Sequence, residues 1–228
     1  MPPPPGTGAQ GVLLDAGKVT LTGPAGSSLN STQLTESNNA YYLSLSGTGG
    51  PTIGTIVAGA YTLTGAGGTD LGPFNATVTL GAPLTVAGGL PSTVTRGAGL
   101  TLNWTGGNPS DTVTVTGYAT TITNDFQTGA TFVCYTTAGA QTLTVNSSIL
   151  NQLPAVSEAA NTNFTGYSYL TVSSTVNPAA GDGYFIAPLT AGGGIANATF
   201  LGTTYANATV AYHIEGFRAN ESSPTSSC

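Results

Sequence analysis

Charged side chains are scarce in this sequence. They make up 5% of the 228 residues, against roughly a quarter in an ordinary soluble domain. The only basic residues are Lys18, Arg96 and Arg218, and the formal net charge is −6. Proteins bind nucleic acids and anionic lipid surfaces through clusters of Lys and Arg. We therefore expect this chain to bind neither.

Long apolar runs are also lacking. No uninterrupted hydrophobic stretch approaches the ~18 residues of a membrane-spanning helix, so we expect no membrane span. Gly and Pro are abundant, with 33 and 14 residues. Disorder is nevertheless not expected, because Val, Ile, Thr and Tyr recur in the short alternating runs that are typical of β-strands.

Residues that build catalytic centres are few. His213 is the only histidine, and no Gly-x-Ser-x-Gly motif accompanies it. One histidine and two separated cysteines do not favour zinc. We predict no enzyme, no cofactor and no bound metal. The acidic residues are spread singly, and we expect solvated turn positions rather than a glycosidase pair: Asp15, Glu36, Asp70, Asp111, Asp125, Glu158, Asp182, Glu215 and Glu221.

Two short turns have a weak calcium-loop character. They are "NPSD" at 108–111 and "GDG" at 181–183. Each supplies one carboxylate, whereas calcium takes about six to eight oxygen ligands. We expect ordinary turns at both places.

The two cysteines are Cys134 and Cys228. In "ATFVCYT", Cys134 shares a strand face with Phe132, and both are predicted to lie in the core. We expect Cys134 to be a buried free thiol, since unpaired cysteine packs as a small hydrophobic residue. A disulfide to Cys228 is the alternative.

Short alternating segments separated by Gly-rich turns predict an antiparallel β-sandwich architecture. One short helix is expected within 147–161, capped by Ser147 or Ser148 and interrupted at Pro154. The expected strands lie in 12–23, 40–47, 54–65, 74–81, 82–90, 99–107, 111–118, 129–136, 141–150, 167–175, 183–189 and 197–212.

The segments fall into two series. We predict a Pro-rich leader or linker at 1–10, one sandwich at 11–82, a second at 83–212 and a flexible tail at 213–228. The start "MPPPPGTGAQG" has neither the basic residues nor the apolar core of a signal peptide. Composition still favours an extracellular or cell-surface protein whose leader has been removed.

Two aromatic residues are predicted to anchor the cores. Trp104 alternates with Leu100 and Leu102 in "LTLNWTGG", which favours burial over display on the surface. Tyr61 opens an alternating strand after a turn glycine in "VAGAYTLTG", as does the tyrosine that folds back on a corner of immunoglobulin-like domains. We expect both side chains to be buried.

Several longer stretches carry a resemblance to a family. "GLPSTVTRGAGLTLNWTGGNPSDTVTVTGY", "GATFVCYTTAGAQTLTVNSSILNQLPAV" and "YFIAPLTAGGGIANATFLG" resemble secreted immunoglobulin-like or fibronectin-type β-sandwich proteins of acidobacteria. The first-half run from "LDAGKVTLTG" to "FNATVTLG" resembles the same family, so the likeness covers about residues 12 to 212. It implies export and two tandem sandwiches. It brings no activity and no site residues with it.

Three functions fit these features. The leading interpretation is a secreted structural or adhesive module, which could associate with itself through uncharged edge strands into a fibre or surface layer. The alternative is a carbohydrate-binding module, with Tyr41, Tyr118 and Tyr167 as ligand-facing candidates from a wider set that includes Tyr42 and Tyr169. A third possibility is a water-ordering surface of alternating threonines, although no constant repeat supports it.

Overall fold

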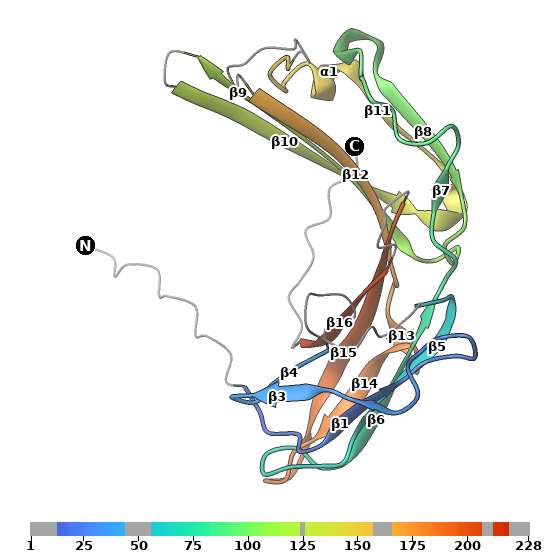
Figure 1. The fold of residues 1–228 in the computed structure, drawn as a ribbon, viewed down its shortest axis with the longest axis vertical. Coiled ribbons are helices and arrows are strands. Elements are labelled where there is room, and N and C mark those ends of the chain that lie inside the picture. Colours follow the sequence, from blue (N-terminus) through green and yellow to red (C-terminus); the bar gives the residue numbers. More distant parts are fainter. Residues whose placement is uncertain (1–12, 44–55, 124–125, 157–165, 207–211, 219–228) are drawn as a thin grey trace.

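The computed structural model describes residues 13–43, 56–123, 126–156, 166–206 and 212–218. Most described elements are β-strands in antiparallel sheets, arranged as an elongated arc (Figure 1). One short α-helix occurs among them. These features confirm the prediction of an all-β chain with at most one short helix.

The first sheet is built from strands with an apolar residue at every second position. In β1 (Val19–Thr22), Val19 and Leu21 are buried, and the two threonines between and after them are half-buried. This alternation is expected where one sheet face covers a core and the other meets water. The sheet order is β2-β1-β5-β6, with β2 at Thr32–Gln33, β5 at Gly59–Gly65 and β6 at Phe74–Leu80; β3 (Thr35–Ser37) and β4 (Ala40–Tyr42) form a separate hairpin.

The largest sheet runs along the arc from one end to the other. Its order is β10-β9-β12-β15-β14-β13, and β16 also pairs with β15. All pairs are antiparallel except β13 with β14. The strands are β9 (Thr112–Thr123), β10 (Phe126–Thr137), β12 (Gly166–Thr175), β13 (Ala179–Ala180), β14 (Gly183–Pro188), β15 (Gly194–Tyr205) and β16 (Tyr212–Arg218).

A third sheet, of three strands, lies at one end of the arc. It has the order β11-β8-β7, with β7 at Thr85–Val86, β8 at Leu100–Thr105 and β11 at Thr142–Val145. Two 3₁₀-helices, η1 (Arg96–Ala98) and η2 (Ala138–Ala140), precede β8 and β11.

The α-helix α1 is shorter than predicted, since it spans Ser147–Leu150. Its N-cap is Asn146, without a side-chain capping bond, rather than Ser147 or Ser148. Leu150 is buried and the helix ends well before Pro154. Burial of Leu150 therefore accounts better for this turn than capping does, because so short a helix is stable only when it packs against a core.

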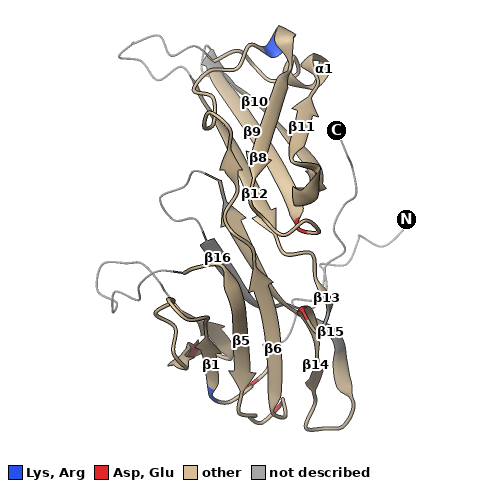
Figure 2. Cartoon of the chain, turned by 90° about the vertical axis from the view of Figure 1, so that its right-hand side faces the viewer, with Lys and Arg blue, Asp and Glu red and all other residues tan. Residues whose placement is uncertain are grey.

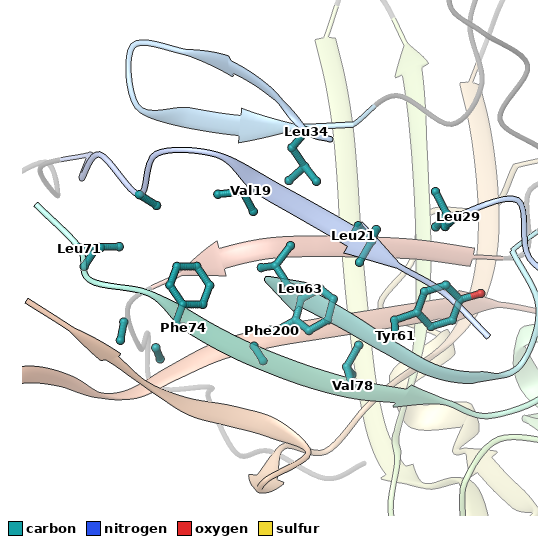
Figure 3. Close-up of a cluster of buried hydrophobic side chains, with 14 of the residues drawn as sticks. Val19, Leu21, Leu29, Leu34, Tyr61, Leu63, Leu71, Phe74, Val78 and Phe200 are labelled. Carbon is teal, nitrogen blue, oxygen red and sulfur yellow. The ribbon is translucent and has the colours of Figure 1, made fainter. Parts of the chain in front are cut away.

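The first hydrophobic core lies against β1, β5 and β6. Figure 3 shows Phe200, from β15, among the side chains of Leu63 and Val78. Tyr61 is 0% exposed, as predicted from its position. Its hydroxyl donates to the carbonyl of Val57 at 2.7 Å and accepts the Val57 N–H at 3.0 Å. A buried tyrosine thus has its polar end satisfied by the corner that precedes its strand.

The second core lies between β9, β10 and β12 on one side and β7, β8 and β11 on the other (Figure 1). Trp104 is 3% exposed, and its indole Nε1 donates to the carbonyl of Ala138 at 3.1 Å. Phe132 is also buried there, together with Val113 and Val115. The alternation in both segments therefore correctly identified the faces that point into the core.

Cys134 belongs to the second core and is fully buried. It is disulfide-bonded, so the expectation of a free thiol is wrong. Alternation identifies the face on which a cysteine lies, but packing alone does not reveal its oxidation state. The other cysteine of the sequence, Cys228, lies outside the described residues.

The two cores divide the chain differently from the predicted boundaries. Val176, Ala187, Ala198 and Phe200 pack in the first core, although they follow the segments that build the second. The strand β15 connects the two, because Ala206 just after its end lies in the second core. The hairpin β14–β15 therefore completes the first half of the molecule. Local sequence patterns do not show such a long-range return.

The predicted flexible tail also begins too early. Residues Tyr212–Arg218 form β16, which pairs with β15. Backbone hydrogen bonds hold such a strand, and composition carries little information about them. The remaining tail (219–228) and the predicted leader (1–10) lie outside the described residues.

Candidate functional site

Three tyrosines from neighbouring strands contact one another. Tyr169 lies directly opposite Tyr118 across the β9–β12 pair, and Tyr167 lies opposite Thr120. The ring centroid of Tyr118 is 5.4 Å from that of Tyr169, with 26° between the planes, and 5.3 Å from that of Tyr167, with 44°. Offset and tilted packing of this kind is favourable for aromatic rings. We call Tyr118, Tyr167 and Tyr169 the tyrosine cluster.

The tyrosine cluster points away from the second core. Gly117 and Ala119, on either side of Tyr118, are buried on the opposite face of the sheet. Tyr167 and Tyr169 are 45% and 49% exposed, and Tyr118 is half-buried in contact with both. In Figure 1, β9, β10 and β12 lie on the concave side of the arc, whereas β8 and β11 lie on its convex side. The cluster therefore faces the concave side.

Two small residues, Thr120 and Gly129, lie next to the Tyr118 side chain. Thr120 is 0% exposed and donates through its hydroxyl to the carbonyl of Thr128 at 3.1 Å. A β-carbon at Gly129 would lie 3.2 Å from the Tyr118 hydroxyl and 3.3 Å from the Thr120 hydroxyl. The missing side chain at Gly129 thus leaves room for the Tyr118 ring to extend over β10.

The hydroxyl groups of the cluster are linked. The pKa of Tyr167 is raised, chiefly because its hydroxyl shares a hydrogen bond with Tyr118 and would carry a charge beside it when ionised. Tyr167 therefore stays protonated across the physiological pH range. Tyr167 thus presents a neutral ring and a neutral hydroxyl group.

Hydroxyl side chains surround the cluster on the same sheet face. Thr116 on β9, Thr131 on β10, and Thr171 and Ser173 on β12 occupy positions of the same alternation. No Asp, Glu, Lys or Arg occurs in β9, β10 or β12. Figure 2 accordingly shows charged residues at turns and strand ends, not along these strands. We call this side of β9, β10 and β12 the tyrosine face.

The structure does not bring Tyr41 to the cluster. Tyr41 lies on β4, where its side chain packs against the first core. Its hydroxyl donates to Asp15 Oδ1 at 3.2 Å and accepts the Ala16 N–H at 2.8 Å. Desolvation is the main cause that raises its pKa. Tyr41 therefore has a structural role, and only Tyr118 and Tyr167 of the three ligand-facing candidates lie together.

Asp15 organises the loop that contacts it. Its carboxylate accepts the backbone N–H groups of Thr69 and Gly17, each at 2.8 Å. These bonds, that of Thr69 first, lower the pKa of Asp15 from 3.8 to about 2. The carboxylate therefore lies at a turn and also stabilises its backbone.

Asp111 is an acidic residue for which the expectation of a solvated turn position is wrong. It is 4% exposed, and burial is the main cause that raises its pKa. Its Oδ2 accepts the Asn108 N–H at 3.0 Å, and the Asp182 carboxylate contributes a further upward shift. The turns 108–111 and 181–183 thus lie near each other. No group of three or more His, Cys, Asp or Glu that could hold a metal occurs in the described part of the chain.

Sequence reasoning selected two members of the tyrosine cluster and gave Tyr169 less weight. The signal for Tyr169 is the spacing in "YSY" at 167–169, which puts both rings on one strand face. No sequence signal identifies Thr120 as buried, because its cover comes from a neighbouring strand.

Similarity to known proteins does not indicate a function for this chain. No family model, curated protein or solved structure matches the chain. Within the described residues, no helix combines the length and apolar character needed to cross a bilayer.

Proposed function

We propose that the chain is a non-enzymatic extracellular adhesive module that binds an uncharged polysaccharide on the tyrosine face. The observation that carries the proposal is the tyrosine cluster, in which two half-exposed rings of β12 contact Tyr118 on strands without charged residues. Single exposed aromatic residues are ordinary, but a contiguous exposed group of them marks an interaction site.

Sugar chemistry matches this surface. A pyranose ring offers C–H groups on its faces and hydroxyl groups on its rim. The first pack on aromatic rings, and the second exchange hydrogen bonds with Tyr, Thr and Ser hydroxyls. The exposed sides of Tyr167 and Tyr169 supply the rings, and Thr116, Thr131 and Thr171 supply hydroxyl groups nearby.

Charge decides which polysaccharides fit. The tyrosine face carries no cation that could pair with a carboxylate or sulfate, and the chain as a whole has a net charge of −6. An anionic polymer would therefore meet repulsion without compensating contacts. An uncharged glycan would meet no such repulsion on this face.

An extracellular setting is supported by the disulfide at Cys134. Structural disulfides persist in oxidising compartments and are rare in the cytosol. The resemblance to secreted proteins and the low charge are consistent with the same setting.

We further propose that the two cores correspond to two tandem immunoglobulin-like sandwiches. The hydroxyl of Tyr61 bonds to the backbone four residues upstream, as in the tyrosine corner of that fold. Trp104 on β8 fills the second core in the manner of a fibronectin-type strand. The hairpin β14–β15 would then belong to the first sandwich.

A binding panel tests the functional proposal. We expect the purified protein to be retained in native gels containing uncharged polysaccharides or on insoluble ones, and to pass freely through acidic polysaccharides at equal concentration. Retention should persist at high salt, because no ion pairs contribute. Failure to bind any neutral glycan, or stronger binding to the acidic ones with loss at high salt, would contradict it.

The water-ordering alternative is less well supported by the geometry. The alternating threonines do share one face, as Thr112, Thr114 and Thr116 do on β9. The tyrosine cluster interrupts that face with protruding rings, so the threonines do not form one flat array.

A further inference from the structure

The strand β10 is an edge strand of unusual length for this molecule. It ends the order of the largest sheet, and β9 is its partner over twelve residues. Figure 1 shows β10 at the rim of the upper part of the arc. Other described edge strands are shorter: β2 and β7 have two residues each, β11 has four, and β6 and β16 have seven each.

A second long edge, that of β6, is covered by side chains. The Thr79 N–H donates to Asp182 Oδ1 at 2.8 Å, and the Thr79 carbonyl accepts from Asn108 Nδ2 at 3.1 Å. At Thr79 these two groups make the hydrogen bonds that a neighbouring strand would make. Natural proteins commonly protect exposed edges with charges, prolines or covering groups. In β10 no charged residue and no proline occurs.

Two adjacent residues of β10 are already engaged. Val133 and Cys134 both have partners, and Cys134 is disulfide-bonded. The preceding residues, from Thr128 to Phe132, remain as a segment that a further strand can approach. Thr128, Gly129 and Thr131 are all exposed in it.

We propose that this segment of β10 is a self-association edge, on which a second copy of the chain adds its own β10 in antiparallel pairing. A twofold axis through Ala130 would place Gly129 of each copy opposite Thr131 of the other. This register keeps residues of one sheet face on the same side in both copies. The proposal stands independently of polysaccharide binding.

The neutral edge is a surface on which a second copy can approach without added charge repulsion. Two chains of net charge −6 repel one another at most surfaces. The edge segment is neutral in both copies, so pairing there adds no like-charge contact. A strand that joins through backbone hydrogen bonds needs no special side-chain pocket.

Pairing of two β10 strands would produce one continuous sheet that carries both tyrosine faces on the same side. Tyr118 lies opposite Thr131 within each copy, so both tyrosine clusters would flank the new seam. Two linked sites bind a long polymer more tightly than one by raising the effective concentration.

Sedimentation equilibrium of the purified protein over a wide concentration range tests the proposal. We expect a monomer–dimer equilibrium, and we expect Thr131→Lys to raise the dimer dissociation constant by about tenfold or more, since lysine is a natural protector of edges. Thr128→Lys provides a second edge variant. Thr105→Lys, at an exposed position on β8, is the matched control and should leave the dissociation constant unchanged.

The outcomes separate clearly. A wild-type protein that stays monomeric at every concentration would overturn the proposal. So would a dimer that both edge variants leave intact while their circular dichroism shows native strands. Polysaccharide retention measured on the wild-type protein and on Thr128→Lys, which lies on the sheet face opposite the tyrosines, reports on the tyrosine face separately. Failure of one proposal is thus distinguishable from failure of the other.

Discussion

At the scale of single residues, the side of the strand on which a ring lies determines its role. Trp104 and Tyr169 are both large aromatic residues in alternating segments. Trp104 shares its strand face with Leu102 and is 3% exposed, whereas Tyr169 shares its face with Thr171 and is 49% exposed. The same backbone pattern thus produces a core anchor in one strand and an exposed ring in another.

Replacing Trp104 by Ala should strongly destabilise the protein. The change removes the indole from the second core and one of the two donors to the Ala138 carbonyl, which keeps the Gln141 N–H. We expect the free energy of unfolding to fall by about 3–5 kcal/mol. Urea denaturation measures this, with Tyr42→Ala as the control at a 53% exposed position. Equal stability of the two variants would contradict the burial of Trp104.

The two structural carboxylates should respond to pH in opposite directions. Asp15 has its pKa lowered to about 2, so its stabilisation is present above the ordinary value of 3.8 and is lost as the pH falls toward 2. Asp111 has a raised pKa, so the folded state holds that proton more tightly than the unfolded chain. Its contribution is therefore present below 3.8 and is lost as the pH rises through the raised value.

Replacing Asp111 by Asn should remove part of the pH dependence of stability. The amide cannot ionise, so the loss of stability with rising pH that Asp111 causes should disappear in the variant. Unfolding free energies measured by urea between pH 3 and pH 7 check this. Asp15→Asn should instead flatten the acid side of the profile. If the unfolding free energy of the Asp111→Asn variant changed with pH above pH 4 as it does in the wild type, burial of the Asp111 carboxylate would have no electrostatic cost.

At the scale of elements, the sequence predicted strands better than it predicted their partners. Alternation located β1, β5, β6, β8 and β9 and the faces that carry Tyr61, Trp104 and Phe132. It did not show that β14 and β15 return to the first core, because contacts between distant segments leave no local pattern. The same limit made the tyrosine cluster only partly predictable. The outward face of each strand could be predicted, but not the pairing of β9 with β12.

Within β9, the face toward the core is fitted to Phe132. A β-carbon on Gly117 would overlap the Phe132 ring. The φ of Gly117 is not positive, so the backbone itself would accept alanine and the clash alone opposes it. We therefore expect Gly117→Ala to lower the free energy of unfolding by about 1–3 kcal/mol through overpacking. Gly97→Ala is the control, since no atom lies within 4 Å of its β-carbon. Thermal unfolding of the two variants compares them, and equal midpoints would contradict the packing.

At the scale of the whole molecule, the strands of the largest sheet carry the tyrosine face and also contribute side chains to both cores. The largest sheet extends from β10 to β13, so the concave face and both cores depend on one hydrogen-bonded framework. Charged residues lie mainly at turns (Figure 2), which leaves the extended faces neutral. A neutral, rigid and aromatic surface suits a long uncharged ligand, and the β10 edge would double that surface.

The central claim is that the tyrosine cluster holds the polysaccharide. Its most direct test compares the dissociation constants of Tyr169→Ala and Tyr42→Ala for one neutral polysaccharide that the wild-type protein binds. Tyr42 is as exposed as Tyr169 but lies on β4, away from the cluster. Since an aromatic contact contributes roughly 0.5–1.5 kcal/mol beyond its buried area, we expect about tenfold weaker binding for Tyr169→Ala. Tyr42→Ala should bind as the wild type does. Equal affinities for the two variants would contradict the assignment of the binding site.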